Sequence, residues 1–84
     1  MATRPVDVSI TYCAECGYEE PTLRLVRRLM DDFHLYLRRI EIIPASGGEL
    51  EVVIDGELVH STRISGLFPK ADAIVEAVRQ RLNG

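Results

Sequence analysis

The sequence predicts an α/β fold with the element order β-α-β-β-β-α, a four-stranded mixed sheet and both helices on one face. Three observations predict it: strict apolar–polar alternation over residues 6–12, a helical apolar pattern over residues 21–37, and an Asp55-Gly56 pair between two apolar runs. With 84 residues, of which 46% are hydrophobic, the chain is long enough for one domain, residues 1–84, and too short for two.

The first strand is expected at residues 6–12, where Asp7, Ser9 and Thr11 separate the apolar residues. A strand covered by helices on both sides would be apolar throughout, so one face of the sheet is expected to meet solvent. The helix is expected from Pro21 to Leu37, because proline fits the first helical position. Its apolar residues recur at spacings of three and four, and the predicted buried face consists of Leu23, Val26, Leu29, Met30, Phe33 and Leu37.

A second strand is expected at Ile40–Ile43, ended by Pro44, because proline cannot donate a ladder hydrogen bond. The strand–helix–strand order implies a right-handed crossover and parallel strands. A hairpin follows, with strands at residues 50–54 and 57–62, because Asp-Gly strongly favours a two-residue turn.

The hairpin turn sets a register with Val53 opposite Leu58 and Val52 opposite Val59. The sheet face without helices would then carry a small apolar patch, which suggests a possible homodimer through that open face. Its expected members are Ile43, Glu51, Val53, Leu58 and His60.

The last part of the chain is expected to form a loop and a second helix. The loop, residues 63–70, contains Ser65, Gly66 and Phe68, an aromatic residue that fits neither strand pattern. The helix is expected from Pro69 to Leu82, with an apolar face that is spaced for burial. The members of that face are Ala71, Ile74, Val75, Val78 and Leu82.

The charge balance argues against nucleic acid as a partner. The net charge is −3 and the pI is about 5.3, whereas binding to phosphates normally needs a basic excess. Arginines cluster between residues 24 and 39, but Asp31 and Asp32 lie among them, so a solvated helix face is the better interpretation. The N-terminal residues lack the apolar core of a secretory signal, and no stretch reaches membrane-spanning length. A cytoplasmic location is therefore expected.

The most informative motif is Tyr12-Cys13-Ala14-Glu15-Cys16-Gly17-Tyr18, which contains both cysteines. A disulfide between Cys13 and Cys16 would close a short loop, so it would add less chain-entropy stabilisation than bridges that close long loops. In a reducing compartment such a pair is more often catalytic, redox-sensing or metal-binding than structural. Metal is the weaker alternative, because one CxxC motif supplies half of a zinc site and neither His34 nor His60 has a nearby histidine companion. We therefore expect no metal and no tightly bound cofactor.

Four segments together resemble the selenoprotein W-like (Rdx) family, and the resemblance covers nearly the whole chain in the same order. They are residues 8–18, Gly47–Val52, Asp55–Ser61 and Gly66–Pro69. The resemblance implies a thioredoxin-like fold and a thiol-based redox role, with glutathione as a possible reductant and partner. Family members that contain selenocysteine carry it at the second position of the CxxC frame, where this chain has Cys16.

The resemblance and the sequence leave the order of attack open. Thioredoxin geometry favours Cys13 as the attacking sulfur, whereas the selenocysteine position favours Cys16, with Cys13 as its resolving partner. We prefer Cys16. Because Glu15, Glu19 and Glu20 surround the pair with negative charge, the thiols are not expected to be strongly acidified. The couple is therefore expected to be more reducing than the most oxidising CxxC proteins.

Two functions follow from the sequence. The first is thiol–disulfide exchange with protein or glutathione disulfides, or reaction with peroxide, at Cys13 and Cys16. The second is a binding module without turnover, whose docking changes when the pair is oxidised. In either case Tyr12, Gly17, Ser65, Gly66 and Phe68 are candidates for the surrounding site.

Overall fold

The computed structural model describes residues 4–83 and contains one mixed four-stranded sheet in the order β2-β1-β3-β4. β1 pairs parallel with β2 and antiparallel with β3, and β3 pairs antiparallel with β4. The predicted order of elements is confirmed, with a short 3-10 helix and a one-turn helix in addition. The elements are β1 (Val6–Cys13), α1 (Glu19–Phe33), η1 (His34–Tyr36), β2 (Leu37–Ala45), β3 (Leu50–Ile54), β4 (Glu57–Ser61), α2 (Thr62–Ser65) and α3 (Ala71–Asn83).

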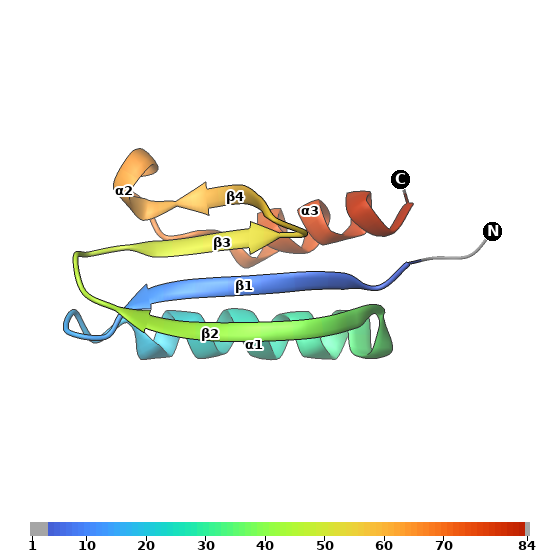
Figure 1. Cartoon of the computed structure of the whole chain (residues 1–84), viewed down its shortest axis with the longest axis horizontal. Coiled ribbons are helices and arrows are strands. Elements are labelled where there is room, and N and C mark those ends of the chain that lie inside the picture. Colours follow the sequence, from blue (N-terminus) through green and yellow to red (C-terminus); the bar gives the residue numbers. More distant parts are fainter. Residues whose placement is uncertain (1–3, 84) are drawn as a thin grey trace.

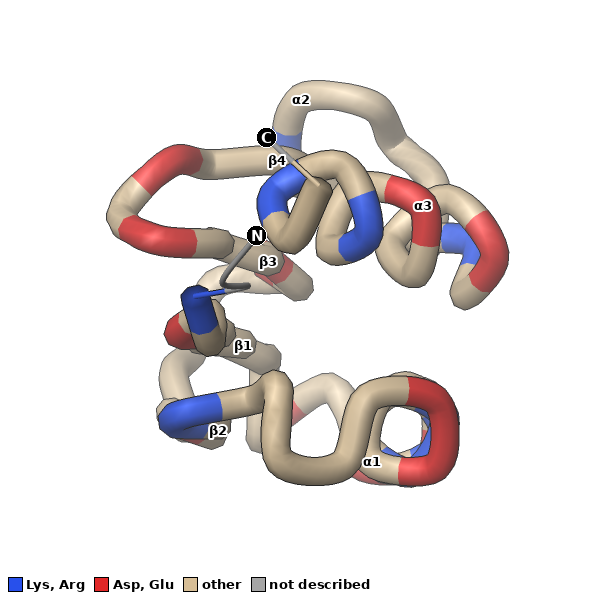
Figure 2. Tube along the Cα trace, turned by 90° about the vertical axis from the view of Figure 1, so that its right-hand side faces the viewer, with Lys and Arg blue, Asp and Glu red and all other residues tan. Residues whose placement is uncertain are grey.

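The two long helices cover the same face of the sheet, as the sequence predicts. α1 lies along β1 and β2, and α3 lies along β3 and β4 (Figure 1). Seen from the end of the molecule, the strands form one layer and the two helices the other (Figure 2). The core fills the space between the layers. Its buried apolar residues are Val6, Val8, Ile10, Leu25, Val26, Leu29, Phe33, Leu50, Val52, Ile54, Ile74, Val75 and Val78.

α1 differs from its prediction at both ends and on its buried face. It ends at Phe33 rather than at Leu37, which is the first residue of β2. It begins at Glu19, two residues before Pro21, which therefore occupies the third helical position. Proline is tolerated there because the first N–H groups of a helix have no partner within it. Leu23 and Met30 were wrongly predicted to be buried, and are 52% and 55% exposed. Leu25 takes their place in the core, so the buried stripe lies further around the helix.

β2 is longer than predicted and includes Pro44, which pairs with Tyr12 of β1. The expectation that Pro44 ends the strand was wrong because β2 is an edge strand. Proline is accepted at an edge, where the missing N–H can face solvent. The predicted parallel pairing of β1 with β2 is confirmed.

The hairpin turn forms at Asp55 and Gly56, with φ angles of 51° and 83°. The predicted pair of Val53 with Leu58 is present, but Val52 pairs with His60 rather than with Val59. The register shifts between Val52 and Val53, because a β-bulge places an extra residue in β4. A bulge depends on tertiary context, so the apolar–polar alternation of the sequence does not reveal it.

The open sheet face is not continuously apolar. Ile43 is 40% exposed on β2, and Leu58 is 46% exposed on β4. These strands form opposite edges of the sheet, and Ser9 and Thr11 of β1 lie between them. Ile43 is therefore separated from Val53 and Leu58, which pair with each other across β3 and β4. A homodimer through this face stays a prediction.

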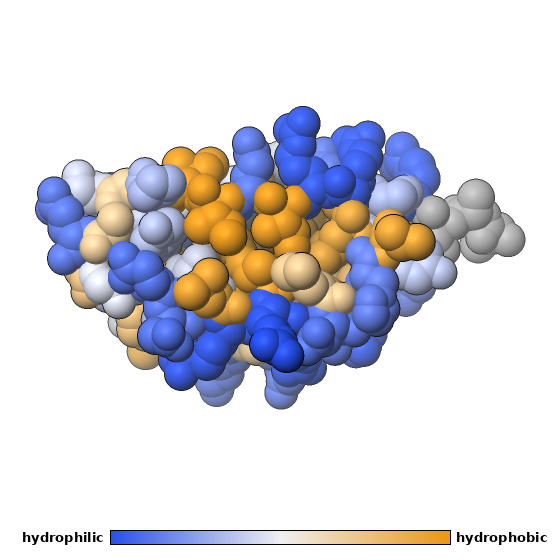
Figure 3. Space-filling model, turned by 90° about the horizontal axis from the view of Figure 1, so that it is seen from below, coloured by the Kyte–Doolittle hydropathy of each residue, from blue (hydrophilic) through white to orange (hydrophobic). Residues whose placement is uncertain are grey.

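A larger gathering of apolar side chains lies on the side of α1 and β2 (Figure 3). Among the exposed large apolar residues, α1 carries Leu23 and Met30, and β2 carries Ile42, which is 41% exposed. Within residues 4–83, no helix is long and apolar enough to cross a membrane.

Candidate redox site

The two cysteines lie where β1 ends and the chain turns into α1. Cys13 is the last residue of β1, and its backbone N–H donates to the carbonyl of Glu49 at 2.7 Å. Ala14 N–H donates to Ala45 O at 2.8 Å, which fastens the turn to the end of β2. Gly17 has a φ of 76°, a value that glycine adopts without a Cβ clash. The turn is thereby fixed on both sides by neighbouring strands.

Cys13 and Cys16 form a disulfide, and their Cα atoms are 5.3 Å apart. The two cysteines differ in exposure, since Cys13 is a fully buried residue whereas Cys16 is an exposed one. An incoming thiolate must reach the sulfur that it attacks. The arrangement therefore offers Cys16 to a partner and keeps Cys13 beneath it.

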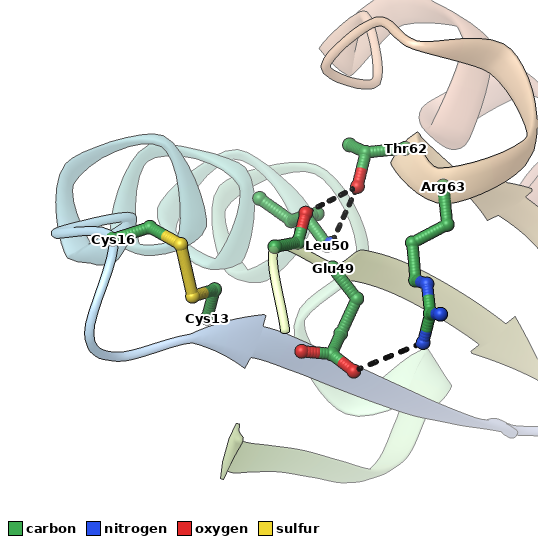
Figure 4. The surroundings of a disulfide bond; sticks show 7 residues. Cys13, Cys16, Glu49, Leu50, Thr62 and Arg63 are labelled. Carbon is green, nitrogen blue, oxygen red and sulfur yellow. Dashed lines mark hydrogen bonds and ion pairs between the residues drawn. A yellow bond between two sulfur atoms is a disulfide. The ribbon is translucent and has the colours of Figure 1, made fainter. Parts of the chain in front are cut away.

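Glu49 is a neighbour of the cysteine turn that no local sequence pattern indicated. It directly precedes β3, and its backbone carbonyl accepts the N–H of Cys13. The Glu49 side chain is 13% exposed, and its Oε2 lies 3.9 Å from a guanidinium nitrogen of Arg63 (Figure 4). Among the described residues, its Oε1 is buried without a hydrogen-bond partner.

A groove of about 550 Å³ starts at Cys16 and runs along the first turns of α1. Its walls come from both ends of the chain, since Tyr18 and Phe68 meet edge to face with their ring centroids 4.9 Å apart. The lining residues are Cys16, Gly17, Tyr18, Pro21, Arg24, Leu25, Phe68, Pro69 and Ala71.

The groove includes some of the predicted site residues and not others. Gly17 and Phe68 line it together with Cys16. Ser65 and Gly66 do not line it, and Tyr12 is half-buried and packs against the core. Ser65 nevertheless supports the loop, since its Oγ accepts a hydrogen bond from Leu67 N–H at 3.1 Å.

His60 also holds this loop, because its Nε2 donates to Leu67 O at 2.8 Å. Leu67 directly precedes Phe68, so a side chain of β4 helps to fix the aromatic wall of the groove. The sequence identified Phe68 as unusual because it fits no strand pattern. Its proximity to Cys16 depends on the fold.

The charge around the site is mixed. Glu15 is exposed in the cysteine turn, and Glu19 and Glu20 occupy the first turn of α1, close to the positive end of the helix dipole. Arg24 follows one turn later and lines the groove. Arg24 was expected on a solvated helix face together with the other arginines of this segment. No local pattern distinguishes it from Arg27, which forms an ion pair with Asp31.

In the part of the chain that the structure describes, no three His, Cys, Asp or Glu side chains gather closely enough to hold a metal ion.

Comparison with known proteins identifies relatives of the whole domain. The Rdx family model matches residues 7–80. Migration and invasion enhancer 1 from Mus musculus is 33% identical over 81 residues, which cover 94% of this chain and 67% of the relative. Selenoprotein W from Danio rerio is 32% identical over 74 residues, covering 87% of this chain and 86% of the relative.

Solved structures match the fold. A selenoprotein W-related protein from Vibrio cholerae superposes with a TM-score of 0.88 at 23% identity, over 94% of this chain and 99% of that one. A protein from Bordetella parapertussis superposes with a TM-score of 0.87 at 24% identity, over 94% of this chain and 100% of that one. The fold is thioredoxin-like, and the chain, with its CxxC pair at residues 13 and 16, belongs to the Rdx family.

Proposed function

We propose that this protein is a thiol–disulfide redox protein that works through Cys13 and Cys16. The observation that carries the proposal is the unequal burial of the paired sulfurs, with Cys13 covered and Cys16 exposed at the mouth of a groove. Membership of the Rdx family, in which the second CxxC position can hold selenocysteine, supports it.

In the reduced protein, the Cys16 thiolate attacks a substrate disulfide and forms a mixed disulfide, and the substrate's other sulfur leaves as a thiolate. Cys13 then attacks the Cys16 sulfur, which releases the substrate thiol and restores the Cys13–Cys16 disulfide. Two electrons pass to the substrate. A low-mass thiol such as glutathione would return the pair to its reduced state. With a peroxide, Cys16 would become a sulfenic acid, and attack by Cys13 would release water.

The cytoplasm is the compartment that suits this cycle, since glutathione there keeps thiols reduced. We propose it as the location, and fractionation of cells that express the tagged full chain would test it. Recovery in an oxidising compartment would contradict it.

Equilibration with glutathione redox buffers, followed by alkylation and mass spectrometry, tests the redox proposal. We expect one reversible two-electron transition, at a potential clearly more negative than the roughly −120 mV of the most oxidising CxxC proteins. The buried Cys13 and the surrounding carboxylates both disfavour a thiolate-stabilised reduced state. A pair that never re-reduces, or a potential near that oxidising limit, would contradict the proposal.

A second candidate function is a binding module whose docking responds to oxidation of the pair. Exposed apolar side chains on α2 and the loop after it favour this function: Ile64 is 81% exposed, Leu67 68% and Phe68 48%. Steady turnover of a disulfide substrate with glutathione would support the redox protein. Binding of a partner that changes on oxidation, without turnover, would support the module.

A further inference from the structure

The groove at Cys16 has two chemically different ends. At one end the exposed sulfur lies beside Gly17, and Tyr18 and Phe68 form an aromatic wall. Pro69 and Leu25 extend the apolar lining. A volume of about 550 Å³ is within the range of sites that bind small or peptide-like ligands. The cavity can therefore accept more than a single sulfur-bearing side chain.

Arg24 is the one charged residue that lines this groove. Five other arginines form ion pairs within 4.0 Å, namely Arg27, Arg28, Arg38, Arg63 and Arg81. Within residues 4–83, Arg24 forms none. Its guanidinium offers a planar set of donors that matches a carboxylate. Among the described residues, the groove thus combines an unpaired cation with an aromatic pair.

The position of this cation limits where an anion can sit on a substrate. Glu15 and Glu19 lie near the sulfur end, so a carboxylate adjacent to the reacting cysteine would meet like charge. Arg24 is six positions beyond Tyr18, the N-cap residue of α1, and this separation corresponds to a helical rise of about 9 Å. Tyr18 is two residues after Cys16 and marks the sulfur end of the groove. An extended chain covers that distance in about three residues, at roughly 3.3 Å each.

We propose that the groove binds an extended polypeptide segment that presents its disulfide to Cys16, packs an apolar side chain against Tyr18 and Phe68, and places a carboxylate on Arg24. The carboxylate lies about three residues from the reacting cysteine. This inference rests on the proposed redox function and specifies its substrate class as an acidic–apolar polypeptide disulfide. The exchange steps and their electron balance are those given above, with a low-mass thiol as the reductant.

The test uses the reduced full chain in single-turnover reactions with three synthetic peptide disulfides of equal length. All three carry an apolar residue beside the cysteine. The first has Glu three residues from the cysteine, the second has Gln at that position, and the third has Glu next to the cysteine and Gln at the third position. We expect the first peptide to react about fivefold faster than the second, the factor that corresponds to about 1 kcal/mol for an exposed charge pair. The third is expected to be the slowest.

Variants identify the group responsible. Arg24→Gln should remove the preference for the first peptide, so that the first and second peptides react at the same rate. Arg27→Gln is the matched control, because Arg27 lies on the same helix outside the groove and should keep the preference. Phe68→Ala should slow all three peptides, and circular dichroism of this variant checks that the fold is retained.

The outcomes separate the substrate proposal from the redox proposal. Equal rates for all peptides, in the wild type and in Arg24→Gln, would overturn the substrate class while the exchange chemistry stands. A further outcome is that oxidised glutathione reacts faster than any of the peptides in the wild type and loses this advantage in Arg24→Gln. That result would overturn the polypeptide assignment in favour of a small disulfide. No reaction with any disulfide would refute the redox function itself.

Discussion

Reducing the Cys13–Cys16 disulfide should lower the free energy of unfolding by about 2 kcal/mol. The bond joins residues separated by three positions and closes a four-residue loop. In the chain-entropy model such a loop removes about 6 cal/mol/K from the unfolded chain, which is about 1.9 kcal/mol at 25 °C. For a domain of this size the corresponding decrease in Tm is about 10 °C.

The assay is urea unfolding of the full chain, oxidised and reduced, with the double variant Cys13→Ser, Cys16→Ser as the control. The control has no disulfide and should give the same free energy of unfolding with and without reductant. If the free energies of unfolding of the oxidised and reduced wild type differ by about 4 kcal/mol or more, the bond has a mainly structural role. A difference below about 0.5 kcal/mol would show that the loop does not constrain the unfolded chain, and would refute the reasoning.

The same quantity can be measured independently as a redox potential. Folding and disulfide formation share one thermodynamic cycle, so a disulfide that stabilises the fold is itself stabilised by folding. A difference of about 1.9 kcal/mol corresponds to about 40 mV for two electrons. The potential in buffer should therefore lie about 40 mV below that of the same chain in denaturant. A potential that rises on folding would contradict the cycle.

Three further predictions concern the scaffold. The hydrogen bond from Arg38 lowers the pKa of Asp7, so the stabilisation from this pair should be complete above the ordinary Asp pKa and disappear as the pH falls through the lower folded value. In urea titrations Asp7→Asn should therefore be less stable than wild type at pH 6, the difference should shrink as the pH is lowered below the ordinary Asp pKa, and a difference that does not change with pH would contradict this. His34 has φ 49° and ψ −119°, a conformation that favours glycine, so His34→Gly should raise the free energy of unfolding by about 1 kcal/mol, and a loss would show that the ring makes a compensating contact. Leu29 is fully buried, so Leu29→Ala should cost about 3–5 kcal/mol by urea unfolding, and a cost below 1 kcal/mol would mean that the core collapses around the cavity.

Local patterns predicted much of this fold because each signal has a direct physical cause. Alternation in β1 arises from one solvated sheet face. Asp55-Gly56 forms the turn because both positions require positive φ. The parallel pairing of β2 with β1 follows from the crossover rule for strand–helix–strand units.

The errors occurred where tertiary contacts decide. Leu23 and Leu25 are equally apolar, and only the rotation of α1 on the sheet selects the one that is buried. Thr22 is buried as well, which is possible because its Oγ1 donates to Tyr18 O at 2.8 Å. Pro44 remains in a strand because β2 lies at the sheet edge.

The candidate site was predictable in part. The cysteine spacing identifies the pair, but it does not show which sulfur is buried. Phe68 could be singled out by its lack of a strand pattern, whereas its position beside Cys16 required the packing of α3. No local sequence pattern marks Glu49 or Arg24. The position of Glu49 next to Cys13 depends on strand register, and Arg24 is distinguished by the absence of an ion-pair partner within residues 4–83.

The most direct test of the central claim is trapping of the mixed disulfide in the two single-cysteine variants. Reduced Cys13→Ser and Cys16→Ser proteins are each exposed to a peptide disulfide, and the covalent adducts are quantified by intact-protein mass spectrometry. The account predicts a rapidly formed, stable adduct on Cys13→Ser, which retains the exposed Cys16, and little adduct on Cys16→Ser. Rapid trapping on Cys16→Ser alone would make the buried Cys13 the attacking sulfur and contradict the account.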